Sequence, residues 1–302
     1  MEKFRGIDYY GIEELLTEEE RMVRDAIRDW VEAEFLPLVA QHHREETFPT
    51  HLIPKLGELG VFGATLKGYG CAGLNNVAYG LITQELERGD SGLRSCASVQ
   101  SSLVMYPIYT YGSEAQKEKW LPRLQRGEAV GCFGLTEPDH GSDPGGMKTR
   151  ALKKGDSYVL NGTKLWITNG SIADVAVVWA KGDDGEIGGY LVETGTPGFS
   201  TLDIHGKFSM RASITSELSF QDCRIPLENK FPTVTGLRGP LGCLSQARYG
   251  IAWGAIGAAM ACYDWALQYA QTRVQFGKPI AQFQLVQRKL VWMLPEITKA
   301  QL

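Results

Sequence analysis

The sequence has few of the residues that build metal centres or disulfide frameworks. Its 302 residues include only five histidines and six cysteines, and no C-x-x-C pair occurs. The histidines show no spacing typical of metal ligands. We therefore expect reduced thiols, a cytoplasm-like compartment and no metal site. The cysteines are widely scattered, at Cys71, Cys96, Cys132, Cys223, Cys243 and Cys262.

An excess of charge and a long apolar run are also missing. The net charge of −4 gives no general attraction for nucleic acid or anionic membranes. The uncharged stretch from Tyr249 to Tyr263 is too short to span a bilayer comfortably, and its Gly250-x-x-x-Gly254 pattern predicts close helix packing instead. The N-terminus, MEKFRGIDYYGIEELLTEEE, lacks the features of a signal or transit peptide. We expect a cytoplasmic protein, or a mitochondrial matrix protein if the source is eukaryotic.

The first 129 residues carry mostly helical patterns. Thr17 and Glu20 match a capping box, and the helix that follows is expected to end near Pro37. Another helix is expected after Asn75-Asn76, and helical patterns also cover 50–59, 91–111 and 114–126. These segments predict a helical N-terminal domain over residues 1–129.

From Val130 the pattern changes to short segments rich in β-branched and aromatic residues. No helix-length segment lies between them, which favours an antiparallel sandwich or barrel over residues 130–240. Helical patterns return near 241–272 and from about residue 283, within a third region, 241–302. The fold class is therefore α+β and multidomain. The expected strands lie in VGCFGLT, SYVLNG, TKLWIT, DVAVVWAK, GGYLVET and SELSFQDCRI.

The segment Gly68-Tyr-Gly-Cys-Ala-Gly73 satisfies the G-x-G-x-x-G pattern of dinucleotide-binding turns. That motif needs a strand–helix–strand unit to place a pyrophosphate at a helix N-terminus. No partner strand follows within 30 residues, and the surroundings are helical. We interpret the segment as a glycine-rich loop between helices.

The loop GLTEPDHGSDPGG, residues 134–146, combines glycines with many side-chain oxygens directly after an expected strand. Glycines let a backbone approach a planar or anionic ligand, and Thr136 and Ser142 add hydroxyl donors. Trp166 and Thr168 lie on a later strand, LWIT. A surface turn and an ordinary strand would explain each segment alone. Together they could form an aromatic wall and a set of donors for a flat heteroaromatic ring.

Four segments, GLTEPDHGSD, LWITNG, ARYGIAWG and RVQFGKPI, resemble those of acyl-CoA dehydrogenases, which are flavoproteins. The resemblance extends from the first helix to Leu302. LERGDSGLRSCASVQSSLV and GLTEPDHGSDPGGMKTRA are most similar to the glutaryl-CoA dehydrogenases within this family, and His140 is a mark of that group rather than a metal ligand. The resemblance implies a helical N-terminal domain, a middle β-domain and a C-terminal helical bundle.

The resemblance also implies FAD as cofactor. Leu135 and Thr136 would meet the flavin ring, Trp166 would lie against it, and Thr168 would donate toward its reactive edge. Ser142 and Arg248 would lie along the acyl-CoA channel. A further group would reach the FAD of a neighbouring subunit, so a homo-oligomer, such as a dimer of dimers, is implied. This group is Arg273, Gln275, Phe276 and Gln284.

Substrate choice depends on Glu87, Arg94 and Ser98. Arg94 and Ser98 are four residues apart and share one helical face. A buried arginine is costly unless an anion pairs with it, and glutaryl-CoA carries a distal carboxylate. In glutaryl-CoA dehydrogenases the matching arginine and serine hold that group, and the matching glutamate accompanies them. The alternative is that Arg94 caps a helix or lies on its surface and has no role in substrate binding.

The implied reaction is the oxidation of glutaryl-CoA, with decarboxylation to crotonyl-CoA and transfer of electrons to an electron-transferring flavoprotein. The resemblance places it in lysine and tryptophan degradation. The family's catalytic glutamate lies in a Tyr-Glu-Gly-Thr-like loop that is missing here, and the other family position for a base holds Ala247. We expect the base beyond Leu302, in a C-terminally truncated dehydrogenase. The alternatives are a short-chain acyl-CoA dehydrogenase, or a chain without a base that binds acyl-CoA or flavin.

Overall fold

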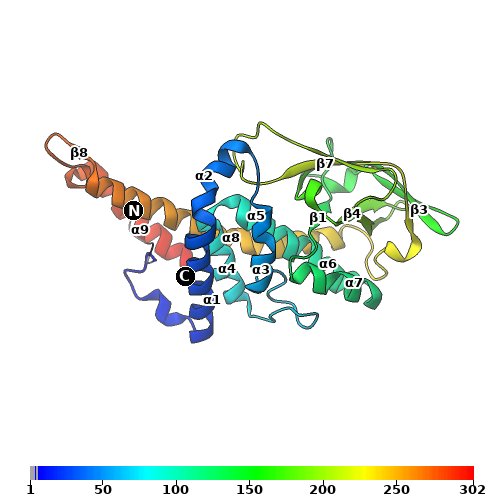
Figure 1. Cartoon of the computed structure of the whole chain (residues 1–302), viewed down its shortest axis with the longest axis horizontal. Helices are drawn as coiled ribbons and strands as arrows, with labels where there is room; N and C mark the ends of the chain where they lie inside the picture. Colours follow the sequence, from blue (N-terminus) through cyan, green and yellow to red (C-terminus); the bar gives the residue numbers. More distant parts are fainter. Residues whose placement is uncertain (1–3, 5) are drawn as a thin grey trace.

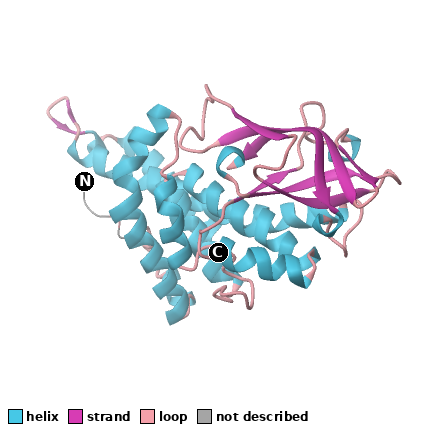
Figure 2. Ribbon diagram, turned by 45° about the vertical axis from the view of Figure 1, so that its right-hand side comes forward, coloured by secondary structure: helices cyan, strands magenta, loops and turns pink. Residues whose placement is uncertain are grey.

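The computed structural model describes residue 4 and residues 6–302. Helices form one part of the molecule, and a large sheet lies beside them (Figures 1 and 2). The long helix α8 runs from the sheet toward the opposite end of the molecule, where a small hairpin protrudes (Figure 1).

The N-terminal helices largely follow the expected pattern. Thr17 Oγ1 accepts from the Glu20 N–H and the Glu20 carboxylate accepts from the Thr17 N–H, so the capping box is confirmed. Asn75 caps α4 through its side-chain oxygen. The helices are α1 (Glu18–Trp30), α2 (Leu36–Glu45), α3 (Ile53–Glu58), α4 (Asn76–Gly89), α5 (Ser91–Ser98), α6 (Tyr106–Tyr111) and α7 (Glu114–Gln125), with short 3₁₀ turns at Ile12–Leu15 and Thr50–Leu52.

The helix end expected near Pro37 was wrong. A π-helical segment, Val31–Phe35, carries the chain from α1 into α2, and Pro37 lies in the first turn of α2. The Leu36 N–H donates to the Val31 carbonyl five residues earlier, so a wider π-helical turn carries the chain across Pro37, which has no N–H to donate. The helical path therefore continues to Glu45. A second π-helical segment, Val99–Met105, joins α5 to α6 in the same way.

The middle region forms one seven-stranded sheet in the order β1-β4-β2-β3-β7-β6, with β5 paired to β4. Most pairs are antiparallel, as expected, but β4 runs parallel to β1 and, at one residue pair, to β2. The expected strands SYVLNG and TKLWIT form a single strand, β3. The strands are β1 (Gly131–Gly134), β2 (Arg150–Lys154), β3 (Ser157–Thr168), β4 (Val175–Lys181), β5 (Ile187–Glu193), β6 (Phe199–Asp203) and β7 (Thr215–Pro226).

Strand β4 joins the sheet to the helices. Val175, Val177 and Trp179 pack into the main core with the helices. The alternate residues of β4, such as Val178, pack into a second core within the sheet. A strand buried on both faces explains the nearly continuous apolar run DVAVVWAK.

The C-terminal region is helical, as expected, and contains α8 (Arg238–Thr272) and α9 (Gln284–Gln301). Strands β8 (Val274–Gln275) and β9 (Lys278–Pro279) form the small hairpin between them. Gly250 and Gly254 are buried on α8, where it packs against α4, which confirms the expected close helix packing. The segment 68–73 is a loop between α3 and α4, as interpreted from the sequence.

Candidate functional site

A cavity of 320 Å³ opens where the loop after β1, the end of β3 and the first turns of α8 meet. Val99 and Leu103 of the second π-helical segment line it as well. In the described part of the chain, no residue is hydrogen bonded to the hydroxyls of Thr136, Ser142 or Thr168. Six residues singled out in the sequence line this cavity: Leu135, Thr136, Ser142, Trp166, Thr168 and Arg248.

A β-bulge turns Trp166 out of the sheet. The pairing of β3 with β7 shifts register between Lys164 and Ile167, and Trp166 lies between them with φ at 63°. The residue is 58% exposed, whereas Lys164 and Ile167 are buried. A positive φ is a strained conformation for a bulky residue, and such strain concentrates at functional sites. The bulge presents the indole as a wall of the cavity.

A buried ion pair underlies the loop after β1. The Lys164 ammonium donates to Glu137 Oε1 over 2.8 Å and to the Leu135 carbonyl over 3.0 Å. The Glu137 carboxylate also accepts from the backbone N–H groups of Lys148 and Thr149, over 2.6 and 3.0 Å. Lys164 and Glu137 are 0% and 5% exposed. The pair ties both ends of the loop to the middle of β3.

Burial and hydrogen bonding act in opposite directions on this pair. Burial alone would raise the pKa of Glu137, but hydrogen bonds from Lys148, Lys164 and Thr149, with the Lys164 charge, lower it to about 2. Burial lowers the pKa of Lys164 to about 8, although Glu137 opposes that shift. Both groups are therefore charged at neutral pH.

The residues singled out for substrate choice form a second cluster beside the cavity, without lining it. Arg94 and Ser98 lie on α5, and Glu87 lies on the facing helix α4. Arg94 Nε donates to Glu87 Oε2, and the Ser91 hydroxyl donates to Glu87 Oε1 over 2.5 Å. The three predicted residues are buried, with exposures of 3% to 9%.

Two structural elements connect this cluster to the cavity. Val99, which lines the cavity, follows Ser98 directly in the chain. On α8, Arg248 lines the cavity and the next residue, Tyr249, stacks on Tyr79. Residues that are adjacent in the chain therefore line the cavity on one side and contact the region of the cluster on the other.

Comparison with known proteins agrees with this architecture. Family models for the N-terminal, middle and C-terminal domains of acyl-CoA dehydrogenase match residues 17–128, 132–223 and 235–302. The mitochondrial short-chain specific acyl-CoA dehydrogenase of Rattus norvegicus is 39% identical over 300 residues, which is 97% of this chain and 72% of that protein. The chain belongs to the acyl-CoA dehydrogenase family.

Two solved structures of dehydrogenases show how similar the folds are. A glutaryl-CoA dehydrogenase from Mycobacterium smegmatis in complex with FADH2 is 50% identical, with a TM-score of 0.95, and the match covers 97% of this chain and 76% of that one. The butyryl-CoA dehydrogenase of Megasphaera elsdenii is 36% identical, with a TM-score of 0.88, over 95% of this chain and 77% of that one. Both substrate classes therefore occur among the similar dehydrogenases.

The remaining predicted flavin residues of this acyl-CoA dehydrogenase lie away from the cavity. Gln275 and Phe276 belong to the β8–β9 hairpin, which protrudes at the end of the molecule opposite the sheet (Figure 1). Phe276 is 87% exposed and has φ at 52°. Arg273 precedes the hairpin and Gln284 begins α9. The chain therefore brings together four of the eight predicted flavin residues, Leu135, Thr136, Trp166 and Thr168, in the cavity. The other four lie at or beside the hairpin.

No carboxylate lines the cavity among the described residues of this dehydrogenase. Ala247 is 5% exposed, so the alternative family position for a base is a small buried residue. No group of three or more His, Cys, Asp or Glu side chains in the described chain could hold a metal ion. None of its described helices is both long and apolar enough to cross a membrane.

Sequence reasoning did not single out three residues that shape this site. Glu137 and Lys164 lay inside the quoted motifs, and the only signal was a lysine directly before the apolar Leu-Trp-Ile run of β3. The Tyr79 hydroxyl is hydrogen bonded to Ser98 of the substrate cluster and lies 3.0 Å from Ser102 Oγ, and burial raises its pKa. Its signal was the spacing of eight residues to Glu87, which places both on one face of a helix.

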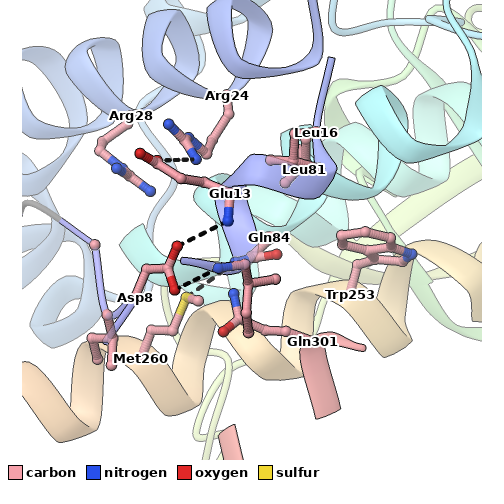
Figure 3. Close-up of a pocket in the computed structure, with 13 residues that line it drawn as sticks. Asp8, Glu13, Leu16, Arg24, Arg28, Leu81, Gln84, Trp253, Met260 and Gln301 are labelled. Atoms are coloured by element: carbon pink, nitrogen blue, oxygen red, sulfur yellow. Dashed lines mark hydrogen bonds and ion pairs between the residues drawn. The ribbon is translucent and has the colours of Figure 1, made fainter. Parts of the chain in front are cut away.

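A smaller cavity of 80 Å³ lies between the N-terminal segment and helices α1, α4, α8 and α9 (Figure 3). Each of its charged groups has a partner within the protein. Arg24 contacts Glu13 over 3.2 Å, and Asp8 accepts from the backbone N–H of Glu13 over 2.9 Å (Figure 3). Arg28 pairs over 2.6 Å with Glu85, which does not line the cavity. With its charges satisfied internally, this cavity is assigned no ligand.

Proposed function

We propose that this acyl-CoA dehydrogenase oxidises glutaryl-CoA with FAD as its cofactor. The observation that carries the proposal is that two sites meet at adjacent residues, Ser98 of the buried cluster and Val99 of the cavity lining. A cavity walled by Trp166 and lined by Thr136 and Thr168 adjoins a buried cluster that contains Arg94. The first site suits a flavin and a thioester, and the second suits a distal carboxylate.

The residues present fit a flavin. Trp166 offers a flat apolar face, and Thr136 and Thr168 offer hydroxyls that no other described residue engages. Beyond Trp166 and Thr168 lies an open hollow of 550 Å³, lined by residues 204–210. It provides room for the parts of a dinucleotide that extend beyond the ring. When bound, FAD supplies the acceptor for the hydride that leaves the β-carbon of the substrate.

The chain's own residues would orient this chemistry. The hydroxyls of Thr136 and Thr168 would donate to polar edges of the flavin, and Trp166 would cover one face of the ring. Ser142 and Arg248 lie on the same cavity and would contact the acyl-CoA. Val99 and Leu103 would cover the apolar part of the acyl chain and exclude water, which strengthens each polar contact in the site.

The geometry of α5 suits a five-carbon diacid. Arg94 precedes Val99 by five residues, which corresponds to about 7.5 Å along a helix. The four carbon–carbon bonds of a glutaryl group extend over about 5 Å. Arg94 uses Nε for Glu87, so its two terminal amino groups can form a fork onto a carboxylate, with Ser98 on the same face.

The catalytic base is not assigned to a residue of the cavity, because no carboxylate lines it among the described residues. We propose that the base is a glutamate outside this set. The Arg273 region would contact the FAD of a neighbouring subunit in a homo-oligomer. The products would be crotonyl-CoA and CO2, as in lysine and tryptophan degradation, with electrons passing to an electron-transferring flavoprotein.

A short-chain acyl-CoA substrate is the second candidate. The rat relative named above supports it, and the fold alone does not discriminate between the two. In that case Arg94 would have only a structural role toward Glu87. A binding protein for acyl-CoA or flavin that lacks its own base is a third candidate, supported by the cavity lining.

The visible absorption spectrum of the purified chain tests these candidates. Bound FAD should show the perturbed spectrum of an enclosed flavin, and absence of FAD binding would overturn the proposed cofactor site.

Glutaryl-CoA and butyryl-CoA are then added to the FAD-loaded chain in the absence of oxygen. We expect glutaryl-CoA to perturb the spectrum at lower concentration. Bleaching would show that a working base lies within the chain, and a perturbed but unbleached flavin would show binding without a base. A preference for butyryl-CoA would contradict the glutaryl assignment.

A further inference from the structure

The Lys164 ammonium lies directly beneath the segment that begins the cavity wall. It donates to the Leu135 carbonyl and to the Glu137 carboxylate, which are the residues on either side of Thr136. Thr136 is itself held through its carbonyl, which accepts from the Leu165 N–H over 2.9 Å. Two consecutive residues of β3, Lys164 and Leu165, therefore fix three consecutive residues of the loop.

The same lysine precedes the bulge that presents Trp166. The register of β3 breaks immediately after Lys164 and resumes at Ile167. The side chain of Lys164 points into the core, with 0% exposure, whereas Trp166 faces the cavity. One residue is thus anchored to both walls of the proposed flavin site: the loop at Thr136 and the strand at Trp166.

Glu137 extends this connection to the far end of the loop. Its carboxylate accepts from the N–H groups of Lys148 and Thr149, so it closes the segment between residues 137 and 148 around one buried group. Ser142, which lines the cavity, lies within the closed segment. A shift of Lys164 would therefore move Thr136 directly and Ser142 through Glu137.

Packing alone does not require a charge at this position. A buried ion pair is often no more stable than apolar residues of similar volume, because both charges must leave water. A methionine could fill the same space beside Met147, whose sulfur is 4.0 Å from the ammonium. What a methionine could not do is hold the Leu135 carbonyl and the Glu137 carboxylate in fixed directions.

We propose that Lys164 is a positioning residue for the cofactor site, which fixes the direction of Thr136 relative to Trp166 through the Leu135 carbonyl and Glu137. This inference rests on the proposed function for its FAD-dependent consequences. Its structural consequence, a loop ordered by one lysine, holds for the chain without cofactor.

Three variants separate positioning from simple stabilisation. Lys164→Met with Glu137→Gln removes both charges and keeps similar volumes, so the fold does not retain an unpaired carboxylate. Lys164→Arg keeps the charge with a different donor geometry. Lys154→Met, on the exposed end of β2, is the matched control for the loss of one lysine from the sheet.

The first measurement is amide hydrogen exchange on the chain without FAD. In the double variant we expect faster exchange in residues 135–149, with unchanged exchange in β4 and β5. Unchanged exchange in the loop would overturn the inference, whatever the outcome for FAD. Faster exchange throughout the sheet would also overturn it, because it would show a general stabilising role.

The second measurement is FAD affinity and the flavin reduction potential across the same variants. We expect the double variant to bind FAD about tenfold more weakly, the scale seen when groups that orient ligand-contacting residues are removed, and to shift the potential. Lys164→Arg should recover part of the affinity, and Lys154→Met should match the wild type. If the wild type binds no FAD, the proposed function fails, while the exchange result still decides the positioning of the loop. If the wild type and the double variant bind FAD equally, the inference fails and the proposed function stands.

Discussion

Arg94 on α5 and Glu87 on α4 form a buried pair in which Nε of the guanidinium donates to the carboxylate. Ser91 donates to the second oxygen of the same carboxylate. The pair holds the guanidinium by one edge and fixes its plane. The other edge, with two terminal amino groups, has the geometry that binds a carboxylate through two parallel hydrogen bonds.

Replacing Arg94 by Met should therefore change substrate preference. We expect glutaryl-CoA to bind the FAD-loaded chain more weakly by about 2 kcal/mol or more, roughly 30-fold, because the distal carboxylate loses its charged partner. Butyryl-CoA, which has no such group, should bind with little change. Isothermal titration calorimetry with both thioesters measures the difference without requiring catalysis. Arg94→Lys is the control that keeps the charge and loses the fork, and equal losses for both thioesters would contradict carboxylate recognition.

Glu137 should make stability depend on pH in the acid range. Its folded pKa of about 2 lies below its ordinary value of 4.5, so its stabilising contribution is complete above about pH 4.5 and is lost as the pH falls from 4.5 to 2. At pH 7, Glu137→Gln should destabilise the fold by about 3 kcal/mol, because it leaves the buried Lys164 ammonium without its counter-charge. Denaturant unfolding at several pH values should show this difference shrinking toward acid.

The control for Glu137 is an exposed ion pair. Lys119 and Glu193 are 2.6 Å apart, with side chains that are 50% and 41% exposed. Such pairs contribute less than about 1 kcal/mol. Glu193→Gln should therefore show a small effect at pH 7. A Glu137→Gln difference that stays constant between pH 7 and pH 3 would show that the carboxylate charge is not what stabilises the loop.

Gly257 on α8 should be intolerant of even one added methyl group. A Cβ at this position would lie 1.9 Å from the Gln84 carbonyl oxygen on α4, so the two helix backbones would have to separate. Gly→Ala normally stabilises a helix by about 1 kcal/mol, and here we expect the opposite sign, with a clear fall in melting temperature. Ala255→Gly, on the exposed side of α8, should cost only about 1 kcal/mol. A more stable Gly257→Ala variant would contradict the close helix contact.

The sequence predicted most of the elements because their signals are local. Thr17 and Asn75 indicate where helices begin, because N-capping involves only a few neighbouring residues. Strands β2 and β6 were not predicted, because RALKK is highly charged and FSTLD is a largely exposed edge strand. The helix end predicted near Pro37 was wrong because the π-helical segment Val31–Phe35 continues the helical path into α2. The parallel pairing of β1 with β4 joins segments more than 40 residues apart, beyond the reach of local patterns.

The candidate site likewise contains residues that the sequence indicated and residues that it did not. Motifs in the sequence indicated the side chains that face the cavity, such as Thr136 and Trp166, because those residue types suit a flat cofactor. The residues beneath the cavity gave almost no signal. Lys164 and Glu137 are 27 residues apart, and each alone would be an ordinary surface charge. Only the pairing of β3 with the loop after β1 buries them together.

Trp166→Gly should separate stability from cofactor binding. The backbone at Trp166 has φ at 63°, which glycine adopts without the strain that a side chain imposes. Because Trp166 is 58% exposed, little packing is lost when the indole is removed. We expect the chain without cofactor to unfold at an equal or slightly higher temperature than the wild type, since relief of strain offsets the small loss of contacts. We expect FAD to bind at least about tenfold more weakly, because the aromatic wall of the cavity is gone. Calorimetric unfolding and FAD titration measure the two effects.

The contrasting variant is Ile167→Ala, at a buried neighbour that is 3% exposed. It should lower the unfolding temperature because it leaves a cavity in the core. A Trp166→Gly variant that is strongly destabilised without cofactor would show that the indole supports the fold rather than the site.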